Sequence, residues 1–214
     1  MSLFDAKSLR FLVGPKQEPR QVSFILEPGE ILRISGHSGS GKTTLLRTLA
    51  RLNLPDGGDL LLEGKSWQTI PARKWRTHVA YVNQKPVFFS GTVEANLTRP
   101  FELQVRTSDQ SAMNQAREYL TRLLLPKNIL EQDALTLSVG ESSRASLVRT
   151  LIVNPLVLLL DEPTAALDSK AKEAVALLLR DWLTTATRAI VMVSHDQDTI
   201  EPLSCREISL DIDT

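Results

Sequence analysis

The stretch GHSGSGKTT, residues 36–44, decides the fold because it fits the pattern G-x-x-x-x-G-K-[ST]. It follows the apolar segment 20–36 and precedes KTTLLRTLARLNL (42–54), whose apolar residues recur at helical spacing. A strand before the glycines and a helix after them is the context of a phosphate-binding loop. The alternative is an ordinary Gly-rich turn before a helix, which this context disfavours. The sequence therefore predicts a nucleoside triphosphate site.

The chemistry of this loop follows from its residue types. Glycines allow the backbone to form a nest of N–H groups around an anion, and the start of a helix adds a favourable dipole. We expect Lys42 to reach the β- and γ-phosphates and the Thr43 hydroxyl to ligate Mg²⁺. The candidate nucleotide-binding residues of this phosphate-binding loop are Gly36, His37, Ser38, Gly39, Ser40, Gly41, Lys42, Thr43 and Thr44.

Two acids follow a second apolar segment, LVLLLDE (156–162), whose unbroken hydrophobicity is typical of a parallel strand buried on both faces. We expect Asp161 to hold Mg²⁺ through water, since that ion dehydrates reluctantly. Glu162 is well placed to polarise an attacking water. The alternative for this pair is a helix or turn cap before Pro163.

Two further polar residues end predicted strands. His195 follows the buried segment 188–194, at the sheet edge where phosphates are expected, and it is a candidate hydrogen-bond donor to the γ-phosphate. Taken alone, such a histidine is more often structural. Gln84 ends the strand predicted over 78–84, and by itself a surface glutamine is the simpler interpretation.

The predicted strands alternate with predicted helices, which indicates an α/β fold. We predict a P-loop NTPase core with a mainly parallel sheet, an antiparallel β edge and a helical subdomain inserted at about 92–153. We expect residues 1–214 to form one nucleotide-binding domain. Further strands are predicted within 20–36, 54–64, 188–196 and 206–212, and a further helix over 170–183.

Composition limits the function classes. Lys+Arg and Asp+Glu both total 25, so the net charge is zero, which argues against a protein that coats nucleic acid. Cys205 is the only cysteine, which favours a reducing compartment. The longest apolar run, residues 151–160, is interrupted by Asn154 and Pro155, whereas about 20 apolar residues are needed to cross a bilayer. We expect any membrane contact to be made through a partner.

The order of the motifs resembles the ATP-binding-cassette ATPases. This order is the phosphate-binding loop, Gln84, LSVGE (137–141), LVLLLDEPTAALD (156–168) and His195. The pairing of LSVGE with the second acidic motif is specific, because ordinary P-loop kinases and GTPases lack it. The resemblance covers residues 9 to 210, nearly the whole chain.

This resemblance implies that the chain binds ATP with Mg²⁺ and hydrolyses it. It implies that Glu162 is the catalytic base, that Gln84 senses the metal and the attacking water, and that His195 contacts the γ-phosphate. It also places Asp168 at a subunit interface.

The signature loop, residues 137–141, is implied to close over ATP held by a second copy of the chain. Ser138 offers a hydroxyl and Gly140 a backbone N–H, and a helix expected to begin near residue 141 directs its positive end toward the γ-phosphate. The alternative is a plain helix cap at Ser138.

Two departures from the family pattern stand out. Val139 replaces the usual glycine, and its β-branch narrows the backbone choices, which predicts slower turnover or a looser closed state. The adenine base usually stacks on an aromatic residue 25–30 positions before the loop. Phe11 is the candidate for that role, with core packing as an equal alternative.

The resemblance further implies a homodimer that drives a separate integral membrane permease. Short permease helices would enter a groove beside Gln84, and Phe88 and Phe89 either line that groove or are buried in the helical subdomain. The chain looks most like small bacterial exporter ATPases, including an iron- or metal-export type, placed in the cytoplasm on the inner face of the membrane. The alternative is a soluble cassette for nucleic-acid repair or translation, but the extra domains of such proteins do not fit in 214 residues.

Overall fold

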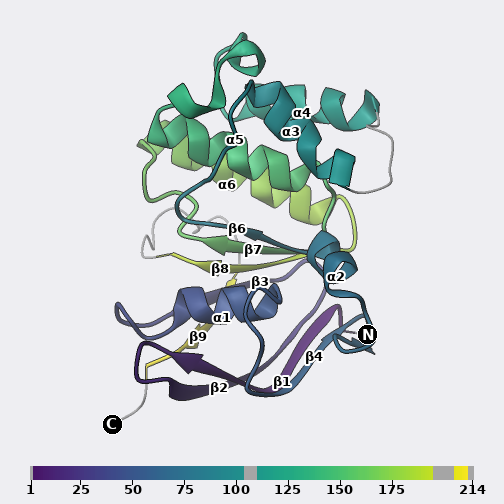
Figure 1. Cartoon of the computed structure of the whole chain (residues 1–214), viewed down its shortest axis with the longest axis vertical. Coiled ribbons are helices and arrows are strands. Elements are labelled where there is room, and N and C mark those ends of the chain that lie inside the picture. The colour runs from purple at the N-terminus through teal and green to yellow at the C-terminus, as the bar shows by residue number, and fades with distance from the viewer. Residues whose placement is uncertain (1, 104–109, 195–204, 212–214) are drawn as a thin grey trace.

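The computed structural model describes residues 2–103, 110–194 and 205–211. Its elements form four layers: an antiparallel sheet, one helix, a parallel sheet and a group of helices (Figure 1). The α/β fold with one parallel and one antiparallel sheet confirms the predicted fold class. None of the helices in these ranges is both long and apolar enough to span a bilayer.

The parallel sheet has the strand order β6-β7-β8-β3-β9, and every neighbouring pair in it is parallel. All residues of the strands ending at Asp161 and Val193 are buried, as their apolar sequences predict. The strand predicted within 206–212 closes one edge of this sheet. The five strands are β6 (Val79–Val82), β7 (Val157–Asp161), β8 (Ala189–Val193), β3 (Ile31–Ser35) and β9 (Cys205–Ser209).

The antiparallel sheet has the order β2-β1-β4-β5. Its long strand β1 was not predicted, and a register shift between Ala6 and Leu9, with Ser8 at φ 46°, explains why: the bulge interrupts the alternation of buried and exposed residues. The four strands are β1 (Phe4–Val13), β2 (Glu18–Leu26), β4 (Gly57–Leu62) and β5 (Lys65–Ser66).

The segment 20–36 supplies two strands, as predicted, but they belong to different sheets. Gly29 lies between them at φ 83°, and its N–H donates to the carbonyl of Arg188 at 2.8 Å. The turn at Pro28-Gly29 therefore carries the chain from the antiparallel sheet into the parallel one.

The helices lie on both sides of the parallel sheet. Helix α1 is sandwiched between the two sheets, and α5 and α6 cover the opposite face with α3 and α4 beyond them (Figure 1). Each side has its own buried apolar cluster. The helices are α1 (Lys42–Leu49), α2 (Ala72–His78), α3 (Val93–Leu103), α4 (Gln110–Arg122), α5 (Val139–Leu151) and α6 (Ser169–Thr184), with short 3₁₀ turns at Ile129–Glu131 and Ala134–Thr136.

Candidate nucleotide-binding site

The phosphate-binding loop joins β3 to α1, as its motif predicts. Gly41 forms the N-cap of α1 at φ 101°, and no side chain caps this helix. A Cβ on Gly41 would lie 2.6 Å from Cγ2 of Val13, so only glycine fits there. The buried Ser40 hydroxyl has no hydrogen-bond partner among the described residues. The loop thus presents uncapped donors in a cradle that suits a phosphate.

Lys42 lies within the concavity of this loop. Its Nζ donates to the carbonyl of Gly36 at 2.6 Å and to that of His37 at 2.9 Å, and the residue is buried. Thr43 is exposed at the start of α1. The ammonium charge is therefore held beside the N–H groups that would contact phosphate oxygens.

Asp161 ends β7 and is buried at 2% exposure. Its Oδ2 accepts a hydrogen bond from the Tyr81 hydroxyl at 2.8 Å. Burial, followed by this bond to a carboxylate, raises the pKa of Tyr81, so the phenol stays protonated and donates. The sequence analysis did not identify Tyr81. The signal was its place in β6 three residues before Gln84, at the strand that neighbours β7.

Gln84 and Glu162 follow the ends of neighbouring strands, and the structure brings them together. The Nε2 of Gln84 donates to Oε2 of Glu162 at 2.6 Å. Glu162 adopts φ 48°, a conformation that is uncommon for a residue with a side chain, and its N–H donates to the carbonyl of Val193 at 3.0 Å. This backbone bond helps to hold Glu162 at the carboxyl edge of the sheet, where ligands bind in such folds.

The oxygen groups of Thr43, Gln84 and Asp161 suit Mg²⁺, which prefers oxygen ligands and usually takes one or two carboxylates together with phosphates and water. Within the described ranges, no group of three or more His, Cys, Asp or Glu side chains forms a metal cage of its own. These few protein oxygens would leave the remaining ligand positions of Mg²⁺ to water and to the phosphates of a nucleotide, which suits an ion that binds together with ATP. His195 lies outside the described residues.

The signature loop begins α5. Ser138 is the N-cap, and its Oγ accepts from the N–H of Glu141 at 3.3 Å while Glu141 Oε2 accepts from the Ser138 N–H at 3.0 Å and hydroxyl at 2.7 Å. These bonds lower the pKa of Glu141. The cap expected as an alternative is therefore present, and it leaves open a second role toward a ligand.

One expectation for this loop needs correction. The helix begins at Val139 and not near residue 141, because the capping box fixes its start at Ser138. Val139 occupies an ordinary helical conformation and is 66% exposed. Its β-branch therefore fits the helical backbone of this chain, and an effect of Val139 on turnover or on the closed state stays a prediction.

Gly140 and Asp168 lie in neighbouring segments. A Cβ on Gly140 would meet the Ala166 carbonyl oxygen at 3.4 Å and Leu167 Cδ2 at 3.5 Å, both ordinary contacts. Asp168 is exposed and is the N-cap of α6, accepting from the N–H of Ala171 at 2.9 Å. The signature loop thus packs beside the connection from β7 to α6 of its own chain.

Phe11 does not face a nucleotide, which corrects the expectation of adenine stacking. It is 1% exposed and lies in the core cluster, and its Cε2 would be 3.3 Å from a Cβ on Gly41. The bulge in β1 sets which residues point inward, so the packing alternative holds. The next residue, Leu12, is 36% exposed and lines a cavity of about 340 Å³ together with Gln17 and Thr44.

His37 has a partner that the sequence analysis missed. Oδ1 of Asp211, just beyond the end of β9, accepts from the His37 N–H at 2.9 Å and lies 2.7 Å from its ring Nδ1. These bonds lower the pKa of Asp211. The signal for this pair was the position of the final predicted strand, which runs beside β3 and ends next to the loop.

Comparisons with known proteins agree with this geometry. Residues 19–165 match the family model described as ABC transporter. The chain is 36% identical over 198 residues to the "Probable iron export ATP-binding protein FetA" of Escherichia coli (strain K12), covering 92% of this chain and 87% of that protein. It is 35% identical over 202 residues to the "ATP-dependent lipid A-core flippase" of Bordetella pertussis, covering 92% of this chain but only 32% of the flippase.

Solved structures show the same fold. The structure titled "Dimeric structure of a post-hydrolysis state of the ATP-binding cassette MJ0796 bound to ADP and Pi" matches with a TM-score of 0.82 and 24% identity, covering 96% of this chain and 93% of that one. The "Structure of ATP binding subunit of ABC transporter" matches with a TM-score of 0.85 and 21% identity, covering 97% and 85%. The family match, the relatives and the phosphate-binding geometry together lead to one conclusion: the chain belongs to the ABC transporter family and is an ATP-binding, ATP-hydrolysing subunit of that family.

Proposed function

We propose that this ATPase works as a homodimer with ATP and Mg²⁺ between its subunits, and that it powers a separate integral membrane permease from the cytoplasmic face. The observation that carries the dimer is the exposed start of α5. Ser138 and Val139 are exposed, and the described neighbours of Gly140 are Ala166 and Leu167, not the phosphate-binding loop of the same chain. A positive helix end on the surface suits a phosphate held by another subunit.

Hydrolysis in this proposal depends on the pair of Gln84 and Glu162. Their 2.6 Å hydrogen bond fixes the orientation of the carboxylate, which would accept a proton from the attacking water as general base. Mg²⁺, when bound, supplies charge neutralisation for the phosphates. Asp161 and Thr43 would hold it, and the hydrogen bond from Tyr81 orients Asp161 for that task. His195 stays a candidate contact to the γ-phosphate.

The Glu162→Gln variant tests both dimer and base. An amide keeps the hydrogen-bonding shape but accepts protons poorly, so ATP hydrolysis should fall at least a hundredfold while ATP binding persists. Size-exclusion chromatography with light scattering should then show a dimer that requires ATP and Mg²⁺. A variant that stays monomeric at saturating ATP would contradict the proposed dimer. Ser138→Asp in the same background is the matched control, since it keeps a helix cap but opposes phosphate charge.

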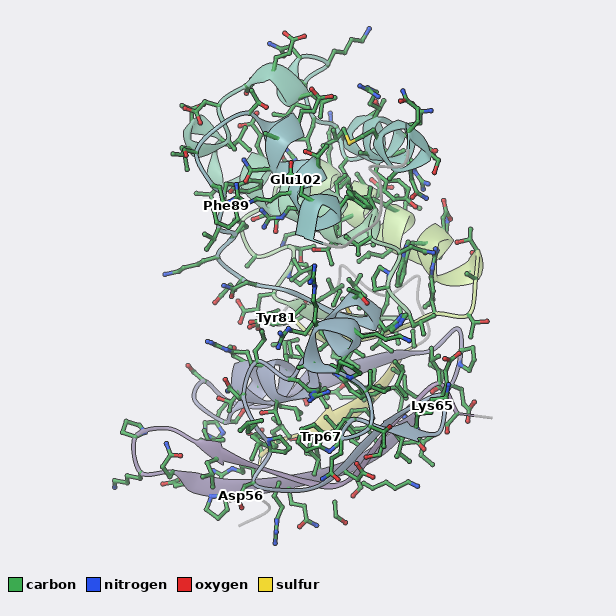
Figure 2. All side chains as sticks on the ribbon, turned by 45° about the vertical axis from the view of Figure 1, so that its right-hand side comes forward. Asp56, Lys65, Trp67, Tyr81, Phe89 and Glu102 are labelled. Carbon is green, nitrogen blue, oxygen red and sulfur yellow. The ribbon has the colours of Figure 1, made fainter. Side chains whose placement is uncertain are left out.

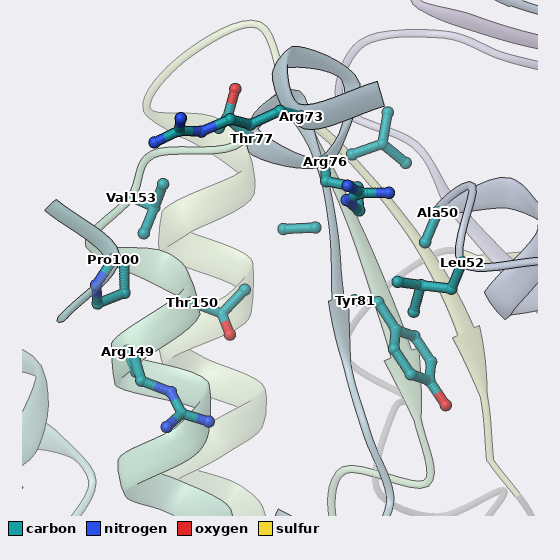
Figure 3. Close-up of a pocket in the computed structure, with 12 residues that line it drawn as sticks. Ala50, Leu52, Arg73, Arg76, Thr77, Tyr81, Pro100, Arg149, Thr150 and Val153 are labelled. Carbon is teal, nitrogen blue, oxygen red and sulfur yellow. The ribbon is translucent and has the colours of Figure 1, made fainter. Parts of the chain in front are cut away.

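A groove supports the permease as partner. It has a volume of about 390 Å³ and lies between the α1–α2–β6 side of the molecule and helix α5, with Pro100 of α3 at its border (Figure 3). Nearby, Phe88 packs partly buried against the helical core, whereas Phe89 is 50% exposed beside Arg99. Phe88 therefore takes the buried environment, whereas Phe89 is exposed, and neither is among the residues that line this groove. Figure 2 shows Phe89 on the helical side and Tyr81 nearer the sheets.

We further propose metal export, specifically of iron, as the transport reaction, supported by the name of the FetA relative and its nearly full-length match. A strain lacking this chain should accumulate iron under iron excess, measured by mass spectrometry of washed cells. Restoring the wild-type chain should lower the iron content, and Lys42→Ala, which removes phosphate binding, should not. Equal iron content in all three strains would refute the substrate and leave the ATPase assignment intact.

A further inference from the structure

The groove introduced above has an apolar floor and a basic lining. Leu52, Val79 and Val153 contribute apolar side chains, and Arg73, Arg76 and Arg149 point guanidinium groups toward or along it (Figure 3). None of its lining residues is acidic. We call this surface the basic groove, defined by these six residues.

The three arginines lack acidic partners within the described part of the chain, where no carboxylate oxygen lies within 4.0 Å of them. Arg76 donates to the carbonyl of Arg51 at 3.2 Å. Arg149 donates to the carbonyl of Val87 at 3.0 Å, and its guanidinium carbon lies 4.7 Å from the ring centre of Phe88. These contacts hold the side chains in place, but they leave the positive charges uncompensated by a carboxylate.

Arg149 is the most buried of these charges, and burial lowers its pKa. A partner that covers the groove would remove more water from all three guanidinium groups. Burying a charge without a counter-charge is costly, whereas a guanidinium paired with a carboxylate through two parallel hydrogen bonds is well compensated. An apolar floor alone would suit an apolar partner, but the arginines select against one that lacks acidic groups.

We infer that the permease segment that docks in the basic groove is a short apolar element carrying at least one Asp or Glu, whose carboxylate pairs with Arg149 or Arg76. This inference rests on the proposed permease partner. The apolar floor favours such a protein element over a nucleic-acid backbone, which presents no apolar side chains beside its phosphates.

Zero-length crosslinking tests the pairing. Arg149→Lys and Arg76→Lys each place a reactive amine in the groove, and a carbodiimide joins amines only to carboxylates that touch them. Each variant is expressed in its native host, crosslinked in native membranes, purified and mapped by mass spectrometry. We expect a new crosslink from position 149 or 76 to an Asp or Glu of an integral membrane protein, and none from Arg180→Lys, an exposed control on α6.

Charge reversal at Arg149 then measures how much the pairing contributes to co-isolation of the membrane protein. Arg149→Glu should lower the yield of co-isolated membrane protein by roughly tenfold or more, because a like charge would face the partner's acid. Exchanging that mapped acid for Arg should restore the yield. Recovery of the yield by the exchanged pair would also show that the Arg149→Glu protein is folded.

The outcomes separate the inference from the function on which it rests. If an integral membrane protein co-isolates with the wild type and equally with Arg149→Glu and Arg76→Glu, the acidic partner is refuted and the transport role stands. If no integral membrane protein co-isolates with the wild type, both fail. Recovery that depends on nucleic acid or on anionic phospholipid, judged by nuclease treatment and by reconstitution in neutral lipid, also overturns the inference.

A second observation carries an independent inference about the phosphate-binding loop. Asp211 holds the N–H of His37, while Lys42 holds the carbonyls of Gly36 and His37. A Cβ on Gly36 would lie 3.2 Å from Asp211 Oδ1, and the N–H of Leu210 donates to the Ser35 carbonyl at 2.9 Å. Asp211, just beyond β9, therefore holds the N–H of His37, and Lys42, at the start of α1, holds the carbonyls of Gly36 and His37.

We infer that Asp211 is a positioning residue that preorganises the phosphate-binding loop for ATP. Asp211→Ala should raise the KM for ATP by roughly three- to tenfold, the effect of losing one hydrogen bond of ordinary net strength, with kcat changed less than the KM. Asp211→Asn should recover much of the affinity, since its amide oxygen also accepts. Glu131→Ala, an exposed acid in the helical part, is the control. An unchanged KM in Asp211→Ala, or an Asn variant as weak as the Ala variant, would overturn this role.

Discussion

Two helix starts in this molecule are built in opposite ways. Helix α1 begins at Gly41 in a left-handed conformation with no side-chain cap, whereas α5 begins at Ser138 with a complete capping box. The donors at the start of α1 are left for a ligand, but those at the start of α5 are partly satisfied by the chain itself.

The difference reflects where each helix start lies. The phosphate-binding loop is braced by Val13, Lys42 and Asp211, so it keeps its shape without a cap. The signature loop is exposed and has fewer supports, and the hydrogen bonds between Ser138 and Glu141 stabilise it within the chain itself. One site is thus preformed, and in the proposed dimer the other would exchange an internal hydrogen bond for a phosphate. Four predictions test this contrast.

The largest effect is expected at the preformed site. Lys42→Ala removes the charge that lies among the loop carbonyls, so ATP hydrolysis should become undetectable and nucleotide affinity should fall. A fluorescent ATP analogue and a phosphate-release assay measure the two quantities. Lys170→Ala, an exposed lysine on α6, is the control. Wild-type turnover in Lys42→Ala would refute the assignment of the loop.

Phe11→Ala probes the support beneath the same loop. Because Phe11 is buried beside Gly41, its truncation should lower the free energy of unfolding by about 3–5 kcal/mol. Leu12→Ala should instead raise the KM for ATP with little loss of stability, since Leu12 lines the cavity next to Thr44. Denaturant melts and ATPase titrations distinguish them. A stable Phe11→Ala protein with weak ATP binding would restore the stacking role.

At the self-capped site, Ser138→Ala should lower the free energy of unfolding by about 1 kcal/mol, the usual value of an N-cap. Ser138→Asp keeps a cap but replaces the hydroxyl that donates to Glu141 with a carboxylate, so some stability should be lost, and its charge should abolish ATP-dependent dimerisation. Because the folded-state pKa of Glu141 is lowered, the stabilisation from its bonds to Ser138 is present at neutral pH and lost as the pH falls through that pKa. The stability gap between wild type and Ser138→Ala should therefore narrow in acid. Dimerisation by Ser138→Asp would argue that the loop only caps a helix.

Val139→Gly should have the smallest effect. Val139 is exposed and has an ordinary helical backbone, so we expect ATPase activity within about twofold of wild type and a loss of stability of a few tenths of a kcal/mol. A thermal melt and a steady-state ATPase assay suffice. A large gain in turnover would show that the valine side chain hinders closure between subunits.

The sequence predicted those parts of the molecule in which residue type alone dictates geometry. A glycine-rich loop between strand and helix, and acids that end an unbroken apolar strand, have few alternative structures, so Lys42, Asp161 and Glu162 lie on the expected elements. The contact between Gln84 and Glu162 was not predicted, although the rule that parallel strands end at one edge explains why the two residues meet.

The parts that sequence did not reveal depend on register. The bulge in β1 decides that Phe11 points inward and Leu12 outward, and no local pattern shows this. Tyr81 and Asp211 contact Asp161 and His37 from distant positions in the chain, across strand pairings that composition does not determine. The start of α5 was misplaced because the capping box at Ser138 and Glu141 was not recognised.

Tyr81 contributes both to the basic groove and to the candidate nucleotide site. Its ring lines the basic groove, while its hydroxyl donates to Asp161. A segment bound in the groove would thus contact the ring of Tyr81. The hydroxyl at the other end of the same side chain donates to Asp161, the proposed magnesium ligand. In the proposed assembly, this one side chain would link the permease contact directly to the nucleotide site.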